Sequence, residues 1–204
     1  MFPRLVRVHA QCYAACAVLV VLAGSGVVAQ DANDPLAPHA PGIYYYSEAG
    51  GQRQMTKIAP DNYAKTKGGF AFFAGYGEQS KQKAVIEGAH AELQISESRP
   101  VFYFYISAAA GGLGEESAVT PEDYVLSEMQ IKKDKNERRL TIGKVGAYSG
   151  AKMGADKKAV RGFDVEKVGE GIYKVTVSQD LKAGEYCFFR PIAGQGTFFP
   201  FGIK

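Results

Sequence analysis

Short apolar and aromatic runs alternate with clusters of glycine, proline, aspartate and lysine from Gly42 to the end of the chain. No stretch keeps the apolar period of 3.6 residues that marks a long amphipathic helix. In His90–Ser96 and Gly171–Ser178, apolar side chains occupy every second position. A period of two is typical of a β-strand with one face buried and one face in water.

The pattern predicts about ten short strands separated by turn signals. Strands at this spacing, without helices to carry parallel crossovers, favour an all-β fold with an antiparallel sandwich or barrel. Gly42–Tyr46 and Gln54–Ile58 are expected to form a hairpin, and so are Lys83–Glu87 and His90–Ser96 around Gly88-Ala89. The other expected strands are Phe70–Ala74, Val101–Ile106, Val125–Lys132, Arg138–Val145, Val160–Val168, Gly171–Ser178, Gly184–Arg190 and Thr197–Ile203.

The segment Asp180–Tyr186 resembles the corner between strands E and F of immunoglobulin-like and fibronectin-type sandwiches. In that corner a leucine packs inward, a glycine turns the chain, and a tyrosine starts the next strand and bonds back to the corner. Leu181, Gly184 and Tyr186 stand at those positions. The resemblance implies an immunoglobulin-like antiparallel β-sandwich, which is the expected fold.

A longer resemblance involves Lys83–Ala91, Arg99–Tyr105 and Gly171–Val175 together with the corner. These segments resemble a group of exported bacterial proteins that have no known activity. The resemblance covers most of residues 42–204. It implies an exported all-β domain and supplies no site residues.

The N-terminus has the layout of a secretory signal peptide. Basic residues in Met1–His9 precede the apolar run Ala14–Leu22, and small residues precede an expected cleavage site after Ala29. We therefore expect residues 1–29 to be a signal peptide and residues 42–204 to be one β-sandwich domain. Gln30–Pro41 holds three prolines and two aspartates, which predicts a flexible leader. The mature chain is expected in the periplasm, at the cell surface or outside the cell.

The charge balance and the cysteine content exclude some classes of function. Loss of the two signal arginines lowers Lys+Arg from 24 to 22 against 21 Asp+Glu, leaving a net charge of +1. This balance argues against nucleic-acid binding and gives no general attraction to anionic lipid. After the signal peptide there is no second long apolar run, so we expect no transmembrane segment in the mature chain. Cys187 would be its sole cysteine, expected as a small buried hydrophobe.

The chain contains none of the standard catalytic or nucleotide-binding motifs, and we expect no cofactor. His90 is a weak candidate for a metal ligand, with Glu87 and Glu92 close in sequence. The alternation of its strand places His90 on the solvent-exposed face, so a surface histidine is the simpler interpretation.

Runs of adjacent rings are the best candidate for a binding surface. Consecutive strand residues point to opposite faces, so rings in Tyr44-Tyr45-Tyr46 and Phe102–Tyr105 occupy both faces of their strands. Either loops cover the outer rings, or the rings form an exposed patch for a glycan, a peptide or a partner protein. The candidate binding residues are Tyr44, Tyr45, Tyr46, Tyr103 and Tyr105.

The pattern as a whole favours an exported, non-enzymatic binding domain of the bacterial cell envelope with a protein or glycan ligand. One alternative is a carbohydrate-active or other hydrolytic enzyme that uses loop carboxylates. A second is a structural subunit that assembles by strand addition through Phe198–Ile203. The oligomeric state is left open by the sequence.

Overall fold

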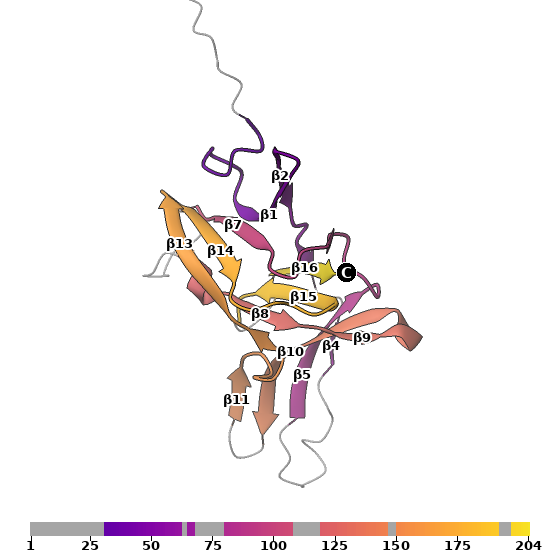
Figure 1. Cartoon of the computed structure of the whole chain (residues 1–204). Helices are drawn as coiled ribbons and strands as arrows, with labels where there is room; N and C mark the ends of the chain where they lie inside the picture. Colours follow the sequence, from indigo (N-terminus) through magenta and orange to yellow (C-terminus); the bar gives the residue numbers. More distant parts are fainter. Residues whose placement is uncertain (1–30, 63–64, 68–79, 108–118, 147–149, 192–196) are drawn as a thin grey trace, which may run out of the picture.

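The computed structural model describes residues 31–62, 65–67, 80–107, 119–146, 150–191 and 197–204, which form three β-sheets (Figure 1). The predicted all-β class is confirmed. The layers are those of a β-sandwich with a third sheet added. Within the described ranges no helix is long and apolar enough to cross a membrane. The predicted signal peptide and the expected strand Phe70–Ala74 lie outside these ranges.

Sheet 1 is antiparallel throughout and contains the predicted first hairpin. That hairpin turns at Gly50 and Gly51, whose φ angles of +60° and +77° are the left-handed values that glycine tolerates. The strands in spatial order are β13 (Phe163–Gly169), β14 (Ile172–Val177), β7 (Val101–Tyr105), β1 (Gly42–Ala49) and β2 (Gln52–Lys57).

Sheet 2 lies between the other two sheets (Figure 1). Its pairs are antiparallel except for one short parallel pair between β6 and β16. The strands in spatial order are β12 (Val160–Arg161), β8 (Val125–Glu128), β15 (Gly184–Phe189), β16 (Thr197–Ile203) and β3 (Asp61–Asn62), with β6 (Gln94–Ile95) beside β16.

Sheet 3 is built around one long strand, β10 (Glu137–Gly146), with a β-bulge between Thr141 and Gly143. The order is β11 (Gly150–Met153), β10, β5 (Ser80–Glu87) and β4 (Lys65–Lys67), and β9 (Gln130–Lys132) also pairs with β10. Short 3₁₀ turns at Pro121–Asp123 and Lys133–Lys135 complete the described elements.

Two of the expected strands are each divided between sheets. Val125–Lys132 breaks at Met129 into β8 of sheet 2 and β9 of sheet 3, and the Met129 amide donates to the Glu185 carbonyl at 2.7 Å. Val160–Val168 breaks at Gly162 into β12 of sheet 2 and β13 of sheet 1. These continuous segments tie all three sheets together.

The predicted hairpin between Lys83–Glu87 and His90–Ser96 is wrong. β5 pairs instead with β4 and β10. Beyond the turn at Gly88 the chain leaves sheet 3 and reaches sheet 2, where Gln94–Ile95 pairs with β16. Side chains from β10 and β15 bind the backbone of the turn and so redirect it, as described below.

Two hydrophobic cores result, one on each side of sheet 2. Alternation along β15 sends Tyr186 and Phe188 into the first core, against sheet 1, and Cys187 and Phe189 into the second, against sheet 3. Other members of the first core are Ile43, Phe102, Phe104, Val175 and Phe201, and of the second Ala84, Ile86, Leu140, Ile142 and Phe198.

The corner that leads into β15 has the hydrogen bond expected from its sequence. Tyr186 Oη donates to the Lys182 carbonyl at 2.8 Å, and Leu181 is buried in the first core. Gly184 follows the corner as the first residue of β15 and pairs with Ile203 of β16.

Replacing Phe188 by alanine and replacing Phe189 by alanine should destabilise the protein by similar amounts, about 3–5 kcal/mol each. Both rings are fully buried, one in each core. Val160→Ala, at a side chain 40% exposed, is the control and should cost less than about 0.5 kcal/mol. Chemical denaturation measures all three. A Phe189→Ala variant as stable as the wild type would contradict the second core.

Candidate functional site

Four tyrosines lie together on the outer face of sheet 1. Tyr44 and Tyr46 come from β1, and Tyr103 and Tyr105 from β7. The register places Tyr44 directly opposite Tyr103. Since side chains two residues apart share a face of a strand, all four rings point away from the first core. We call this surface the tyrosine face.

Tyr45, the fifth tyrosine of the predicted patch, points the other way. Its ring belongs to the first core, 6.1 Å from that of Phe102, and its hydroxyl donates to the Glu97 carboxylate. Burial first, and Glu97 second, raise its pKa. The structure therefore brings together four of the five predicted residues.

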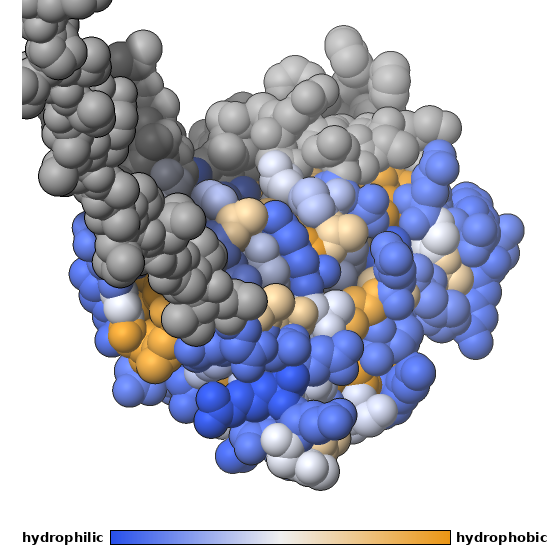
Figure 2. All heavy atoms as spheres, turned by 90° about the horizontal axis from the view of Figure 1, so that it is seen from above, coloured by the Kyte–Doolittle hydropathy of each residue, from blue (hydrophilic) through white to orange (hydrophobic). Residues whose placement is uncertain are grey.

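The rings of the tyrosine face are covered. Tyr44, Tyr103 and Tyr105 are each less than a tenth exposed, and Tyr46 is half-buried. Figure 2 shows a mostly polar surface on which apolar residues form small, separate patches. The sequence leaves open whether the outer rings are covered or form an exposed patch, and in the structure they are covered.

The cover is the N-terminal segment 31–41, which we call the leader. Tyr105 Oη donates to the Pro35 carbonyl at 2.8 Å, and Tyr44 Oη donates to the Ala40 carbonyl at 3.0 Å. Pro35 and Ala37 are buried, whereas Leu36 is 59% exposed. In this structure both halves of the segment are hydrogen-bonded to the sheet.

His39 packs its ring against two of the tyrosines. Its centroid lies 4.8 Å from that of Tyr105 and 5.3 Å from that of Tyr44, and the two tyrosine rings meet edge to face at 5.1 Å. Edge-to-face contacts between rings add to the stabilisation from burial. His39 Nε2 also lies 3.0 Å from the Asp34 carbonyl, which connects the ring to the leader's own turn.

Turn-forming residues give the leader its shape. The Ala37 amide donates to the Asp34 carbonyl, closing a turn in which Pro35 holds the second position. Aspartate first and proline second are favoured in such turns because the carboxylate binds nearby amides and the proline ring fixes φ. The Asp34 carboxylate indeed accepts from the Leu36 amide at 3.0 Å. Asn33 Oδ1 accepts from the Met55 amide and so caps part of the edge of β2.

Gly42 makes room where the leader joins β1. A Cβ atom there would lie 2.7 Å from Lys57 Cε, and its φ of +153° is strained for other residues. With that space free, the Lys57 ammonium sits 5.6 Å from the centroid of the Tyr44 ring, in a cation–π contact.

Burial raises the pKa of Tyr44, Tyr103 and Tyr105. A buried phenol is harder to ionise, so the folded state keeps these groups neutral at pH values where an unfolded chain ionises them. The contribution of these tyrosines to stability is therefore fully present below the ordinary tyrosine pKa of 10.0 and is lost as the pH rises through the raised pKa.

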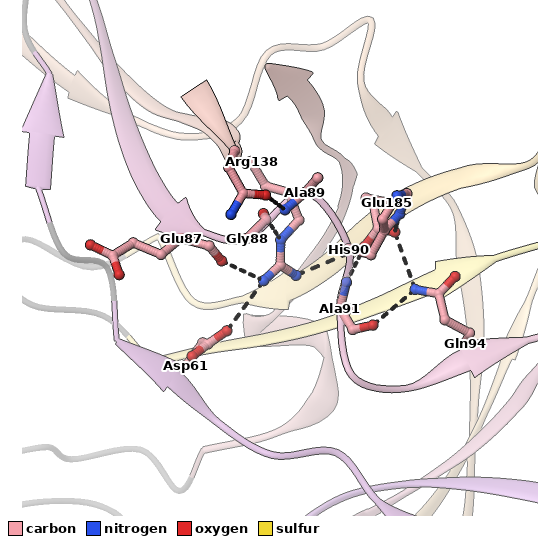
Figure 3. Close-up of polar contacts among 10 residues, drawn as sticks. Asp61, Glu87, Gly88, Ala89, His90, Ala91, Gln94, Arg138 and Glu185 are labelled. Atoms are coloured by element: carbon pink, nitrogen blue, oxygen red, sulfur yellow. Dashed lines mark hydrogen bonds and ion pairs between the residues drawn. The ribbon is translucent and has the colours of Figure 1, made fainter. Parts of the chain in front are cut away.

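His90 belongs to a different part of the molecule, between sheets 2 and 3 (Figure 3). Its side chain is 67% exposed, and Nδ1 lies 3.1 Å from Glu185 Oε1. Glu185 is itself 2% exposed and also accepts from the Ala91 amide at 2.8 Å and from Gln94 Nε2 at 3.1 Å. These bonds satisfy a buried carboxylate and hold the chain that follows the turn at Gly88.

Arg138 holds the other side of the same turn (Figure 3). It is 3% exposed, and it donates from Nε to the Gly88 carbonyl and from Nη2 to the Glu87 carbonyl. Nη1 lies 3.8 Å from Glu185 Oε2, an ion pair without a hydrogen bond, and Nη2 lies 3.5 Å from Asp61 Oδ2. This pair fixes a loop between two sheets, which is a structural role.

Other candidate chemistry is weak among the described residues. A cavity of about 350 Å³ beside Asp61 is also lined by Lys57, Glu92, Leu93 and Pro200. No group of three or more His, Cys, Asp or Glu side chains in the described ranges is placed to hold a metal ion. Burial raises the pKa of the Cys187 thiol, which disfavours the thiolate that a nucleophile requires.

Sequence reasoning missed the leader as the cover of the tyrosine face and missed the buried ion pair. A signal for the first is that proline occurs at every third position, as Pro35, Pro38 and Pro41. A signal for the second is Glu185, which shares its strand face with Cys187 and Phe189.

No protein-family model matches the chain, and no curated protein or solved structure is significantly similar to it.

Replacing Glu185 by glutamine should destabilise the protein by about 3 kcal/mol, because removing one partner of a buried pair leaves the other charge uncompensated. The matched control is Arg99→Met, which breaks the exposed ion pair between Arg99 and Asp180 and should cost less than about 1 kcal/mol. Urea denaturation measures both. Equal costs for the two variants would show that the Arg138–Glu185 contact is not a buried pair.

Replacing Tyr105 by phenylalanine should loosen the leader without unfolding the domain. The lost hydrogen bond leaves the buried Pro35 carbonyl without its donor, so amides of the leader should exchange with solvent about five-fold faster. Tyr46→Phe is the control, since the Tyr46 hydroxyl bonds to Glu48 and not to the leader. Hydrogen exchange at the Ala37 amide is the measurement. Unchanged exchange would mean that this bond does not hold the leader.

Proposed function

We propose that this protein is an exported, non-enzymatic interaction domain of the cell envelope that binds a proline-containing polypeptide segment on its tyrosine face. In the proposal, the leader occupies the same surface from within the chain. The observation that carries it is the pair of hydrogen bonds from Tyr105 to the Pro35 carbonyl and from Tyr44 to the Ala40 carbonyl.

The chemistry of the surface suits such a segment. Tyrosines present ring faces for apolar contact and hydroxyls that donate hydrogen bonds. Proline has no amide hydrogen, so a proline-containing segment offers carbonyl acceptors and apolar rings and leaves fewer amides to be satisfied. Grooves lined by aromatic side chains recognise proline-rich segments in this way. The leader, with its three prolines, is itself a segment of this kind, and it is part of the same chain.

The tether gives the leader an advantage over any ligand in solution. A short connection keeps a bound segment at an effective concentration in the millimolar range. An external segment therefore binds only when it exceeds that value or when the leader is released. We infer that the affinity of the wild-type face for a partner is set by the stability of the leader contact.

Neither alternative gains support from the described residues. Strand addition through Phe198–Ile203 needs a free edge, but β16 pairs with β15 on one side and with β3 and β6 on the other. A hydrolase needs carboxylates in a cleft. At the cavity Asp61 is half-buried and Glu92 is exposed, and the buried Glu185 already accepts hydrogen bonds from the chain after Gly88.

Export, cleavage after Ala29 and a location in the periplasm or at the cell surface are part of the proposal. They are supported by the signal-peptide layout of residues 1–29. The immunoglobulin-like relationship is likewise proposed. The Tyr186–Lys182 hydrogen bond of the corner supports it.

A synthetic peptide of the leader sequence, residues 31–41, should bind the His39→Ala variant of the protein more tightly than it binds the wild type. The substitution removes the ring by which the leader packs against Tyr44 and Tyr105 but leaves the face intact. Fluorescence anisotropy of the labelled peptide measures both affinities. Adding Tyr44→Phe and Tyr105→Phe to the variant should weaken binding about ten-fold or more, because two donors are lost.

Two controls test the chemistry. A peptide with alanine at its three proline positions should bind more weakly than the leader peptide. Adding Tyr46→Phe instead of the other tyrosine changes should leave the affinity unaltered. The proposal fails if the leader peptide does not bind the His39→Ala variant, or if loss of both hydroxyls leaves its affinity unchanged.

A further inference from the structure

The outer face of sheet 3 carries a set of cations on neighbouring strands. Alternation along β5 and β10 sends Ala84, Ile86 and Leu140 into the second core, so the residues between them point outward. The bulge in β10 keeps the outward set aligned, because the register places Lys144 opposite Lys81. We call this surface the lysine face; its cations are Lys81, Lys83, Lys132, Arg139 and Lys144.

The acids on this face neutralise only part of the charge. Asp156 forms an ion pair with Lys81 at 2.6 Å, and Glu137 forms one with Arg139. Glu87 lies on the same face opposite Glu137, so three acids accompany the five cations. Lys83 donates to the neutral Gln130 side chain at 3.3 Å. Burial, and then repulsion from Arg139, Lys81 and Lys132, lowers the pKa of Lys83. Asp156 acts in the opposite direction on the same group.

The two outer faces of the molecule differ in charge. Sheets 1 and 3 lie on opposite sides of sheet 2, so the tyrosine face and the lysine face point in opposite directions. The tyrosine face carries charges of both signs. Asp34 and Glu166 act on Tyr103, but so does Arg53, and the Lys57 ammonium lies over the ring of Tyr44.

The shape of the lysine face favours an extended planar ligand. Its cations stand along two long strands and a third short one, about 5 Å apart between strands, about 7 Å apart along β5 and about 13 Å apart along β10. They do not converge on one point, as the donors of a site for a single phosphate do. None of its outward positions holds an aromatic ring, so it lacks the stacking platform of a single-stranded nucleic-acid site.

We propose that the lysine face docks this protein onto a membrane surface that presents anionic phosphate headgroups. The contact is peripheral and electrostatic, with the lysine ammonium groups and Arg139 close to the headgroups. Docking by this face turns the tyrosine face away from the bilayer, where a polypeptide can reach it. This proposal does not depend on what the tyrosine face binds.

The test uses vesicles of phosphatidylglycerol and phosphatidylcholine in equal parts, with phosphatidylcholine vesicles as the neutral control. The wild-type protein should sediment with the anionic vesicles only. Binding should fall as ionic strength rises from about 0.01 M to about 0.15 M, because the screening length shortens from about 30 Å to about 8 Å. Binding that ignores salt, or that is equal on neutral vesicles, overturns the proposal.

A charge variant tests the face itself. Replacing Lys83, Lys132 and Lys144 by glutamine should weaken partition onto the anionic vesicles about a hundred-fold, which is about five-fold for each lysine. The matched control replaces Lys167, Lys174 and Lys182 by glutamine; these lysines lie outside sheet 3, and binding should change less than about two-fold. Equal thermal midpoints show that both variants fold. Equal binding by the two variants overturns the assignment.

Soluble polyanions separate the two sources of phosphate. Inorganic polyphosphate should compete with the vesicles only at high concentration. If the protein binds polyphosphate and does not bind anionic vesicles, the ligand is a soluble phosphate polymer and the membrane proposal is wrong. Vesicle binding and the binding of the leader peptide are measured separately, so the failure of one leaves the other intact.

Discussion

Strands with rings on both faces must be covered on both faces, and the architecture depends on this constraint. Exposed phenylalanine on β15 or β16 would forgo the burial of a large apolar surface. The molecule covers the second face of these strands with sheet 3, which creates the second core. It covers the outer face of β1 and β7 with the leader. One physical requirement thus has two solutions, a whole sheet and a short segment.

The two solutions differ in how firmly they hold. Sheet 3 is joined to sheet 2 through continuous chain at Met129 and through the buried contact between Arg138 and Glu185. Removing such charges from water is costly, and hydrogen bonds to the backbone of the turn after β5 offset part of that cost. The leader is held by hydroxyl-to-carbonyl hydrogen bonds, by the contacts of the His39 ring with Tyr44 and Tyr105, and by its own turn. It is therefore the part of the described structure best suited to exchange with a ligand.

The sequence predicts the fold class and most strand positions because period-two patterns and glycine turns are local signals. It predicts the Tyr186 corner for the same reason. It does not predict that Val125–Lys132 divides between sheets, since both halves keep one strand pattern. It also does not predict the path after Gly88, because Arg138 and Glu185, which determine it, are distant from the turn in sequence.

For the site, sequence alone identifies the tyrosines but not their cover. Alternation implies that Tyr45 faces away from Tyr44 and Tyr46, yet it does not say which face is the core. The composition of the leader is that of a linker, and composition alone therefore predicts a flexible segment. Its position follows from hydroxyls on β1 and β7 that reach particular carbonyls, and composition does not encode such contacts.

The position of the leader in the chain has a consequence for the order of folding. The leader leaves the ribosome before any strand, yet the surface that it covers needs β1, β7 and β14, whose residues end at Val177. A nascent chain emerges from its N-terminus, so the leader has no complete docking surface until most of the chain has been synthesised. It is therefore the first described segment to be made and among the last to be buried. Throughout that interval its prolines remain open to chaperones, proteases and any receptor that recognises them.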